Sequence, residues 1–166
     1  MDLEAIKSQL IEKDKKLERL FREVDEKIDN IFESQKTPFP ALIGAIIGQK
    51  ISYYSARKMR GDLYSRVGTE FGPEEVLVLD LSFLGQKEDT VRKVSLHIID
   101  NDITLSSEED IYSLECVLGV GKWTTQTTIL TSMIHLDSGY DIFPLGDKFI
   151  QKRMTKLYGN SVDMKR

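Results

Sequence analysis

The three residues Gly119–Gly121, two glycines around one valine, interrupt a stretch that is otherwise helical in character. Glycine is unfavourable inside a helix and is preferred where the backbone turns with a positive φ. Apolar residues recur at helical spacing over 111–117, before the turn, and helical character resumes at Trp123. The sequence therefore predicts two helices joined by a tight hairpin, with Val120 pointing inward to clamp them together.

The backbone amides of this hairpin form a candidate anion site. The amides of the turn, and those at the start of the following helix, are expected to face outward, where they can hold an anion. One phosphate of a nucleic-acid backbone is a natural ligand for such a site, because it is held without reading the base sequence. The alternative is an ordinary turn between two helices, with no ligand.

Helical periodicity extends over most of the chain, and no segment shows the sustained alternation typical of a strand. Residues 3–33 carry an apolar stripe that predicts one long amphipathic helix or two shorter ones, most simply a packing surface. Further helices are expected over about 41–48, over 52–67 with Ser52 as N-cap, from Pro73, within 83–100, from the capping box of Ser107 and Asp110, over 123–136, and over 148–158 up to Gly159. We therefore expect an all-α fold.

The composition is that of an ordinary globular protein, with 40% hydrophobic and 30% charged residues among 166. A single cysteine, Cys116, excludes a disulfide framework, a zinc site built on cysteines and a four-cysteine iron–sulfur cluster within this chain. The sequence contains no apolar run of membrane-spanning length, and its N-terminus does not resemble a signal peptide. We expect an intracellular protein with no membrane partner.

The charge is unevenly distributed along the chain. The net charge is −4, yet residues 37–61 contain four basic and no acidic side chains, and residues 116–166 carry a net charge of +3. The acidic excess lies in residues 1–36 and, mainly, in residues 62–115. If the two basic segments share one face, that face can bind a phosphate backbone despite the overall sign. The alternative is a chance cluster of solvated lysines.

Three blocks of sequence give residues 38–158 a resemblance to the helix–hairpin–helix DNA glycosylases, and within them to the 3-methyladenine DNA glycosylase II branch. FPALIGAIIGQKIS (39–52) is similar to the helix and loop that enter the DNA at the lesion. LECVLGVGKWTTQ (114–126) is similar to the hairpin, and DIFPLGDKFIQKRM (141–154) to the segment with the catalytic aspartate. The resemblance implies a single two-lobed domain over 1–166, with N-terminal helices over 1–36, the hairpin motif over about 107–136 and the catalytic loop and helix over about 141–158.

The resemblance implies a base excision repair enzyme that flips alkylated purines out of duplex DNA and hydrolyses their N-glycosidic bond. Asp147 matches the catalytic aspartate, and a carboxylate suits the role because bond cleavage builds positive charge on the sugar. A plain N-cap is its structural alternative. Trp123 stands where strand-cutting relatives have a Schiff-base lysine, which implies a monofunctional enzyme that leaves an abasic site. The tryptophan could stack on an electron-poor alkylated base, or be a buried core aromatic.

The candidate site residues fall into three groups. The expected substrate pocket consists of Trp123, Thr127 and Phe143. The expected DNA contacts are Gln49, Lys50, Ser52, Gly119, Val120, Gly121, Lys122 and Thr124. Backbone carbonyls near Glu115, Val117 and Val120 are a candidate site for a monovalent cation, and no other cofactor, in particular no iron–sulfur cluster, is expected. The expected partner is double-stranded DNA with damaged bases, bound by a monomer in the cytoplasm of a prokaryote or the nucleus of a eukaryote.

The sequence departs from the family pattern at three places. Lys50 stands at the wedge position, where an apolar side chain would fill the gap in the duplex better, so Gln49 or Ile51 could take this role. Thr127 stands where relatives have room for a second aromatic side chain. Relatives also continue beyond residue 166 with further helices, so we expect a shortened chain, a divergent short member, or one in which residues 1–36 replace that packing.

Two other classes of function remain open. A catalytically silent helix–hairpin–helix DNA-binding module would keep the turn and the basic segments and use Asp147 only as a cap. A helical interaction protein built on the stripe of residues 3–33 would show no salt-dependent binding to DNA.

Overall fold

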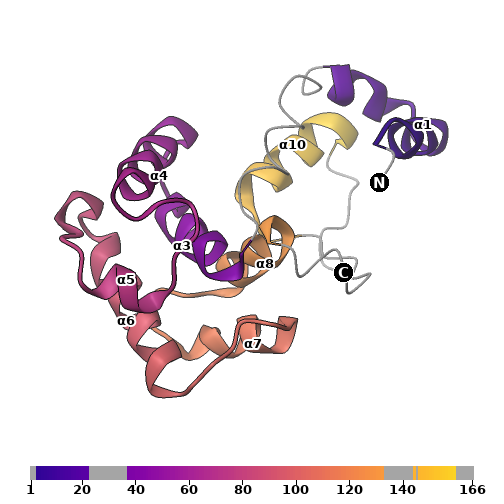
Figure 1. Ribbon diagram of the computed structural model, residues 1–166. Coiled ribbons are helices and arrows are strands. Elements are labelled where there is room, and N and C mark those ends of the chain that lie inside the picture. The colour runs from indigo at the N-terminus through magenta and orange to yellow at the C-terminus, as the bar shows by residue number, and fades with distance from the viewer. Residues whose placement is uncertain (1–2, 23–36, 133–143, 145, 160–166) are drawn as a thin grey trace. The chain divides into compact units, whose positions relative to one another are not determined.

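The computed structural model describes residues 3–22, 37–132, 144 and 146–159. Within these ranges the chain forms helices and turns and contains no strand, so the predicted all-α fold is confirmed (Figure 1). The helices are α1 (Leu3–Lys13), α3 (Pro38–Gly48), α4 (Tyr53–Val67), α5 (Pro73–Leu77), η1 (Ser82–Leu84), α6 (Lys87–Asp100), α7 (Glu108–Ser113), η2 (Leu114–Cys116), α8 (Lys122–Thr131) and α10 (Lys148–Tyr158). None of the helices in the described ranges is both long and apolar enough to cross a membrane.

The chain divides into two compact units. Unit 1 comprises Met1–Ser34 and Phe149–Arg166, and unit 2 comprises Gln35–Lys148. Unit 2 contains α3 to α8 and Asp147.

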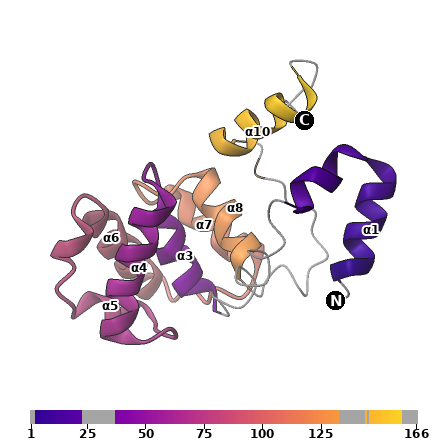
Figure 2. The ribbon, with the colours of Figure 1, turned by 90° about the horizontal axis from the view of Figure 1, so that it is seen from above.

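Helix α3 is the core of unit 2. Its sequence, PFPALIGAIIG, is apolar on all sides, which is typical of a helix surrounded by others. Every residue from Phe39 to Ile47 is buried, and α3 packs against α4, α6 and α8 (Figure 2). The helix begins at Pro38, three residues earlier than expected, because proline lacks only a backbone donor that the first turn does not use.

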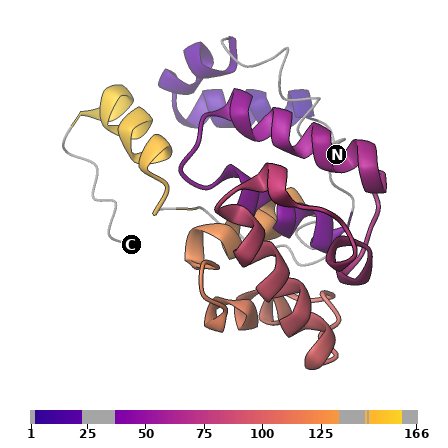
Figure 3. The same ribbon diagram turned by 90° about the vertical axis from the view of Figure 1, so that its left-hand side faces the viewer.

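Helices α4 and α6 pack against α3, and α5 packs against α6; Figure 3 shows this unit with α4 toward the viewer. The predicted N-cap at Ser52 is confirmed, since its hydroxyl accepts a hydrogen bond of 3.2 Å from the amide of Ser55. The predicted helix start at Pro73 is confirmed as well. Leu63, Val91 and Val94 from these helices are fully buried and extend the core around α3.

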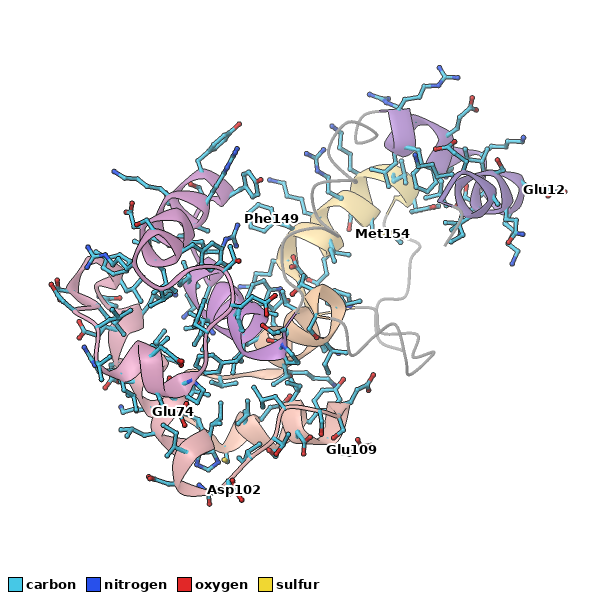
Figure 4. The ribbon with its side chains drawn as sticks, viewed as in Figure 1. Glu12, Glu74, Asp102, Glu109, Phe149 and Met154 are labelled. Carbon is cyan, nitrogen blue, oxygen red and sulfur yellow. The ribbon has the colours of Figure 1, made fainter. Side chains whose placement is uncertain are left out.

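The segment α7–η2–α8 supplies the predicted pair of helices and the turn between them. The capping box is present: the amide of Asp110 donates to the Ser107 hydroxyl over 3.1 Å, and the amide of Ser107 donates to the Asp110 carboxylate over 2.9 Å. The exposed acidic side chains of Asp102 and Glu109 point outward from the α6–α7 part of unit 2 (Figure 4). Helix α8 is described up to Thr131, and the rest of the stretch predicted as helix lies outside the described residues after Ser132.

Unit 1 joins the N-terminal helices to the last one. The apolar stripe of residues 3–33 begins as two helices rather than one, because α1 ends at Lys13 and residues 16–22 form a second helical segment. The hydroxyl of Tyr158 at the end of α10 donates a hydrogen bond to the Asp14 carboxylate between them. This bond lowers the pKa of Asp14 and raises that of Tyr158. The predicted stop of α10 at Gly159 is confirmed, with a φ of 77°.

Candidate functional site

The hairpin turn is built around Gly119. Its φ is 96°, and a β-carbon placed on it would lie 2.5 Å from the hydroxyl oxygen of Thr90 on α6. Gly119 therefore meets two demands, a left-handed backbone and a close approach to a neighbouring helix. Val120 is buried in the core, as predicted, and its amide donates to the carbonyl of Val117 over 2.9 Å.

The backbone of Gly121 does not have the positive φ that is expected of the glycines in this turn. Its φ is −122°, an extended conformation open to any residue, and it occupies the N-cap position of α8. A β-carbon there would meet no atom within 4 Å. The prediction that the turn needs positive φ thus holds for Gly119 and is wrong for Gly121, because extending the backbone at the N-cap is enough to start α8.

A tryptophan–carboxylate pair lies directly after this turn. The indole Nε1 of Trp123 donates a hydrogen bond of 2.6 Å to Oδ2 of Asp147, which immediately precedes α10. The amide of Asp147 donates to the carbonyl of Pro144 over 2.9 Å, which closes a tight turn before the carboxylate. The far edge of the indole ring packs over Gly48 at the end of α3. The sequence-predicted aspartate and tryptophan are therefore neighbours, as expected.

Gln49 ties the loop after α3 to the hairpin. Its side-chain Nε2 donates to the carbonyl of Gly119 over 2.8 Å and to the hydroxyl of Thr124 over 2.7 Å. The Gln49 carbonyl in turn accepts a hydrogen bond of 2.7 Å from the ammonium group of Lys87, the first residue of α6. The loop, the hairpin and the start of α6 are thus held in one network of hydrogen bonds.

Lys50 occupies the exposed tip of this loop in a conformation that is uncommon for its residue type. Its φ is 57°, in the left-handed region that L-residues other than Asn and Asp rarely adopt. Its neighbour Lys87 is partly buried, and burial together with the charge of Lys50 lowers the pKa of Lys87. The Lys50 side chain is exposed, whereas Ile51 packs partly against the core.

The other predicted site residues are distributed around this centre. Lys122 is exposed in the first turn of α8, and Ser52 is exposed at the start of α4. Thr124 is buried with its hydroxyl on Gln49, so its predicted DNA contact stays a prediction. Thr127 is partly buried one helical turn after Trp123, and Phe143 lies outside the described residues.

The predicted cation site at the hairpin also stays a prediction. The Val117 carbonyl accepts the amide of Val120, while the Glu115 carboxylate lies 2.7 Å from the hydroxyl of Thr125 and braces the hairpin against α8. Within the part of the chain that the structure describes, no group of three or more His, Cys, Asp or Glu side chains is arranged to hold a metal ion.

Sequence reasoning did not single out two residues of this site, Lys87 and Thr90. Both belong to α6, inside the acidic segment 62–115, and no local motif marks them. Their importance comes from contacts with Gln49 and Gly119, which are far from them in the sequence. Only the packing of α6 beside the hairpin reveals them.

Comparison with solved structures finds four matching chains, and two of them match over most of their length. One is a 3-methyladenine DNA glycosylase of Schizosaccharomyces pombe, Mag1, in complex with abasic DNA, with a TM-score of 0.61, 23% identity, and coverage of 76% of this chain and 68% of that one. The chain has the DNA glycosylase fold. The second is a DNA-3-methyladenine glycosidase of Bacillus halodurans, with a TM-score of 0.57, 21% identity, and coverage of 92% of this chain and 73% of that one.

Comparison of the sequence with protein families and with curated proteins finds no further relative of this chain. No family model and no curated protein matches the chain. At 21–23% identity the two structures establish a common fold, and the chemistry has to be argued from the residues of this chain.

Proposed function

We propose that the chain is a DNA glycosylase that hydrolyses the N-glycosidic bond of alkylated purines of the 3-methyladenine type in duplex DNA. One observation carries the proposal: the 2.6 Å hydrogen bond between Trp123 and Asp147, directly after a glycine hairpin and beside the loop that follows α3. The shared fold of two 3-methyladenine DNA glycosylases supports it.

Asp147 is the proposed catalytic residue. Departure of the base leaves positive charge on the deoxyribose, and a fixed carboxylate stabilises that charge or orients the attacking water. The indole N–H of Trp123 holds one carboxylate oxygen by a charge-assisted hydrogen bond, which reduces the number of orientations the carboxylate can take. A fixed anion is more effective than a mobile one, because no reorganisation is needed as charge develops.

Trp123 also selects the substrate in this proposal. Its ring is partly exposed, and an alkylated purine with positive charge binds an aromatic face more strongly than a neutral base does. With tryptophan in place of a Schiff-base lysine, the reaction ends at the abasic site and leaves the strand intact.

The proposed DNA contacts adjoin the same network. The hairpin amides and Lys122 are the proposed contacts to one backbone phosphate. The Gln49 amide nitrogen is engaged with the hairpin and Ile51 packs partly against the core, so Lys50 is the proposed DNA contact on the exposed side of this loop.

The test is release of free base from methylated duplex DNA, with strand integrity measured before and after alkali. We expect free 3-methyladenine and strands that break only on alkaline treatment. Salt-dependent binding of duplex DNA without base release would favour the catalytically silent module. No salt-dependent binding at all would favour the helical interaction protein.

A further inference from the structure

We propose that Lys50 and Lys87 together form a binding site for one phosphodiester of the DNA backbone, separate from the phosphate site at the hairpin. This inference rests on the proposed DNA-binding function and adds Lys87, which the sequence did not single out. Its basis is the arrangement of positive charge around the carbonyl of Gln49.

The geometry brings Lys87, at the start of α6, to the loop that carries Lys50. The ammonium group of Lys87 lies 2.7 Å from the carbonyl oxygen of Gln49, and the residue that follows Gln49 is Lys50. Lys50 has a left-handed backbone, and its side chain is exposed. The two like charges repel each other, so the folded protein holds the pair at a cost in stability.

The nearby acidic side chains do not neutralise this pair. Glu88 and Asp89, which follow Lys87 on α6, are engaged with Arg92 at 2.9 Å and Lys93 at 2.6 Å. Among the ion pairs within the described residues, none includes Lys50 or Lys87. Lys87 is also partly desolvated, and both its burial and the charge of Lys50 lower its pKa.

A phosphodiester would offset both the repulsion between Lys50 and Lys87 and the desolvation of Lys87. One negative charge between the two ammonium groups turns their repulsion into two attractions and replaces the water that Lys87 has lost. Lys87 is fixed to the Gln49 carbonyl, and Gln49 is fixed to the hairpin and Thr124, next to Trp123. Occupancy of this site would therefore hold the loop in place beside the tryptophan–aspartate pair.

The test measures how the affinity for a duplex with an abasic-site analogue depends on salt. The variants are the wild type, Lys50→Gln with Lys87→Gln, Lys122→Gln alone as a calibration for one phosphate, and Lys93→Gln as a control on the exposed face of α6. Glutamine at position 87 removes the charge and keeps a donor for the Gln49 carbonyl. A cooperative unfolding transition for every variant establishes that each one folds.

The slope of log K against log salt is negative. We expect the double variant to reduce its magnitude by about 0.9, the value for one phosphate, and Lys93→Gln to leave it unchanged. A fall of about 1.8 would mean two separate phosphates and would overturn the shared site. An unchanged slope in the double variant, with a reduced slope for Lys122→Gln, would overturn this site and leave the proposed function standing. Absence of salt-dependent binding by the wild type would overturn both.

Discussion

Gly119 carries the sharpest prediction at the scale of a single residue. Gly119→Ala would place a methyl group 2.5 Å from the Thr90 hydroxyl on a backbone with a φ of 96°. We expect the free energy of unfolding to fall by about 1–3 kcal/mol, measured by urea denaturation. The matched control is Gly121→Ala, which has open space and an extended backbone and should change stability by less than about 0.5 kcal/mol. Equal losses for both alanines would contradict this account of the turn.

Gly121 has a different role, which appears in binding. Gly121→Arg puts a long side chain over the first amides of α8 without disturbing a packed contact. We expect weaker binding to all duplexes alike, because the lost contact is to a phosphate and not to a base. Fluorescence anisotropy with several unrelated duplexes measures this. A loss confined to one base sequence, or an unchanged affinity, would mean that the hairpin amides do not hold a phosphate.

At the scale of elements, Gln49 joins the loop after α3 to the hairpin. Gln49→Ala removes hydrogen bonds of 2.8 Å to the Gly119 carbonyl and 2.7 Å to the Thr124 hydroxyl. We expect the free energy of unfolding to fall by about 1–3 kcal/mol, and the amides of residues 119–124 to exchange hydrogen faster. Gln86→Ala, at an exposed position, is the control. If exchange in the hairpin stays as slow as in the wild type, Gln49 is not the link between the two elements.

The same elements separate what the sequence predicts from what it does not. Helix starts at Ser52, Pro73 and Ser107 were predictable, because caps and first-turn prolines act over three or four residues. The sequence does not specify the break of the N-terminal stripe at Asp14, because an apolar stripe with helical spacing fits one helix or two.

The candidate site was predictable in its residues more than in its contacts. Asp147 and Trp123 were singled out by motif, yet the motif does not contain the hydrogen bond that joins them. The inward direction of the Gln49 side chain, and the part played by Lys87, depend on contacts across 38 to 75 residues of chain. Such contacts come from the packing of α6 and α8 around α3, which local patterns do not specify.

At the scale of the whole molecule, the link between Asp14 and Tyr158 should make stability depend on pH at both ends. The hydrogen bond lowers the pKa of Asp14 from 3.8, so its contribution is present above that value and is lost as pH falls through the lowered pKa. It raises the pKa of Tyr158 from 10.0, so the contribution is present below that value and is lost as pH rises through the raised pKa. Thermal unfolding of Tyr158→Phe beside the wild type should therefore differ most near neutral pH. A difference that is constant with pH would exclude this pair as the cause.

The central claim is that Asp147, held by Trp123, stabilises the sugar cation during base release. Asp147→Asn keeps the size of the side chain and removes its charge. The decisive measurement is the single-turnover rate of base release from methylated duplex DNA, with Asp102→Asn as an exposed control on unit 2. We expect the rate of Asp147→Asn to fall by about 100- to 1,000-fold, equivalent to about 2.7–4 kcal/mol, while binding to an abasic-site duplex persists and the control keeps the wild-type rate. Release of methylated bases by Asp147→Asn at the rate of the wild type would contradict the mechanism.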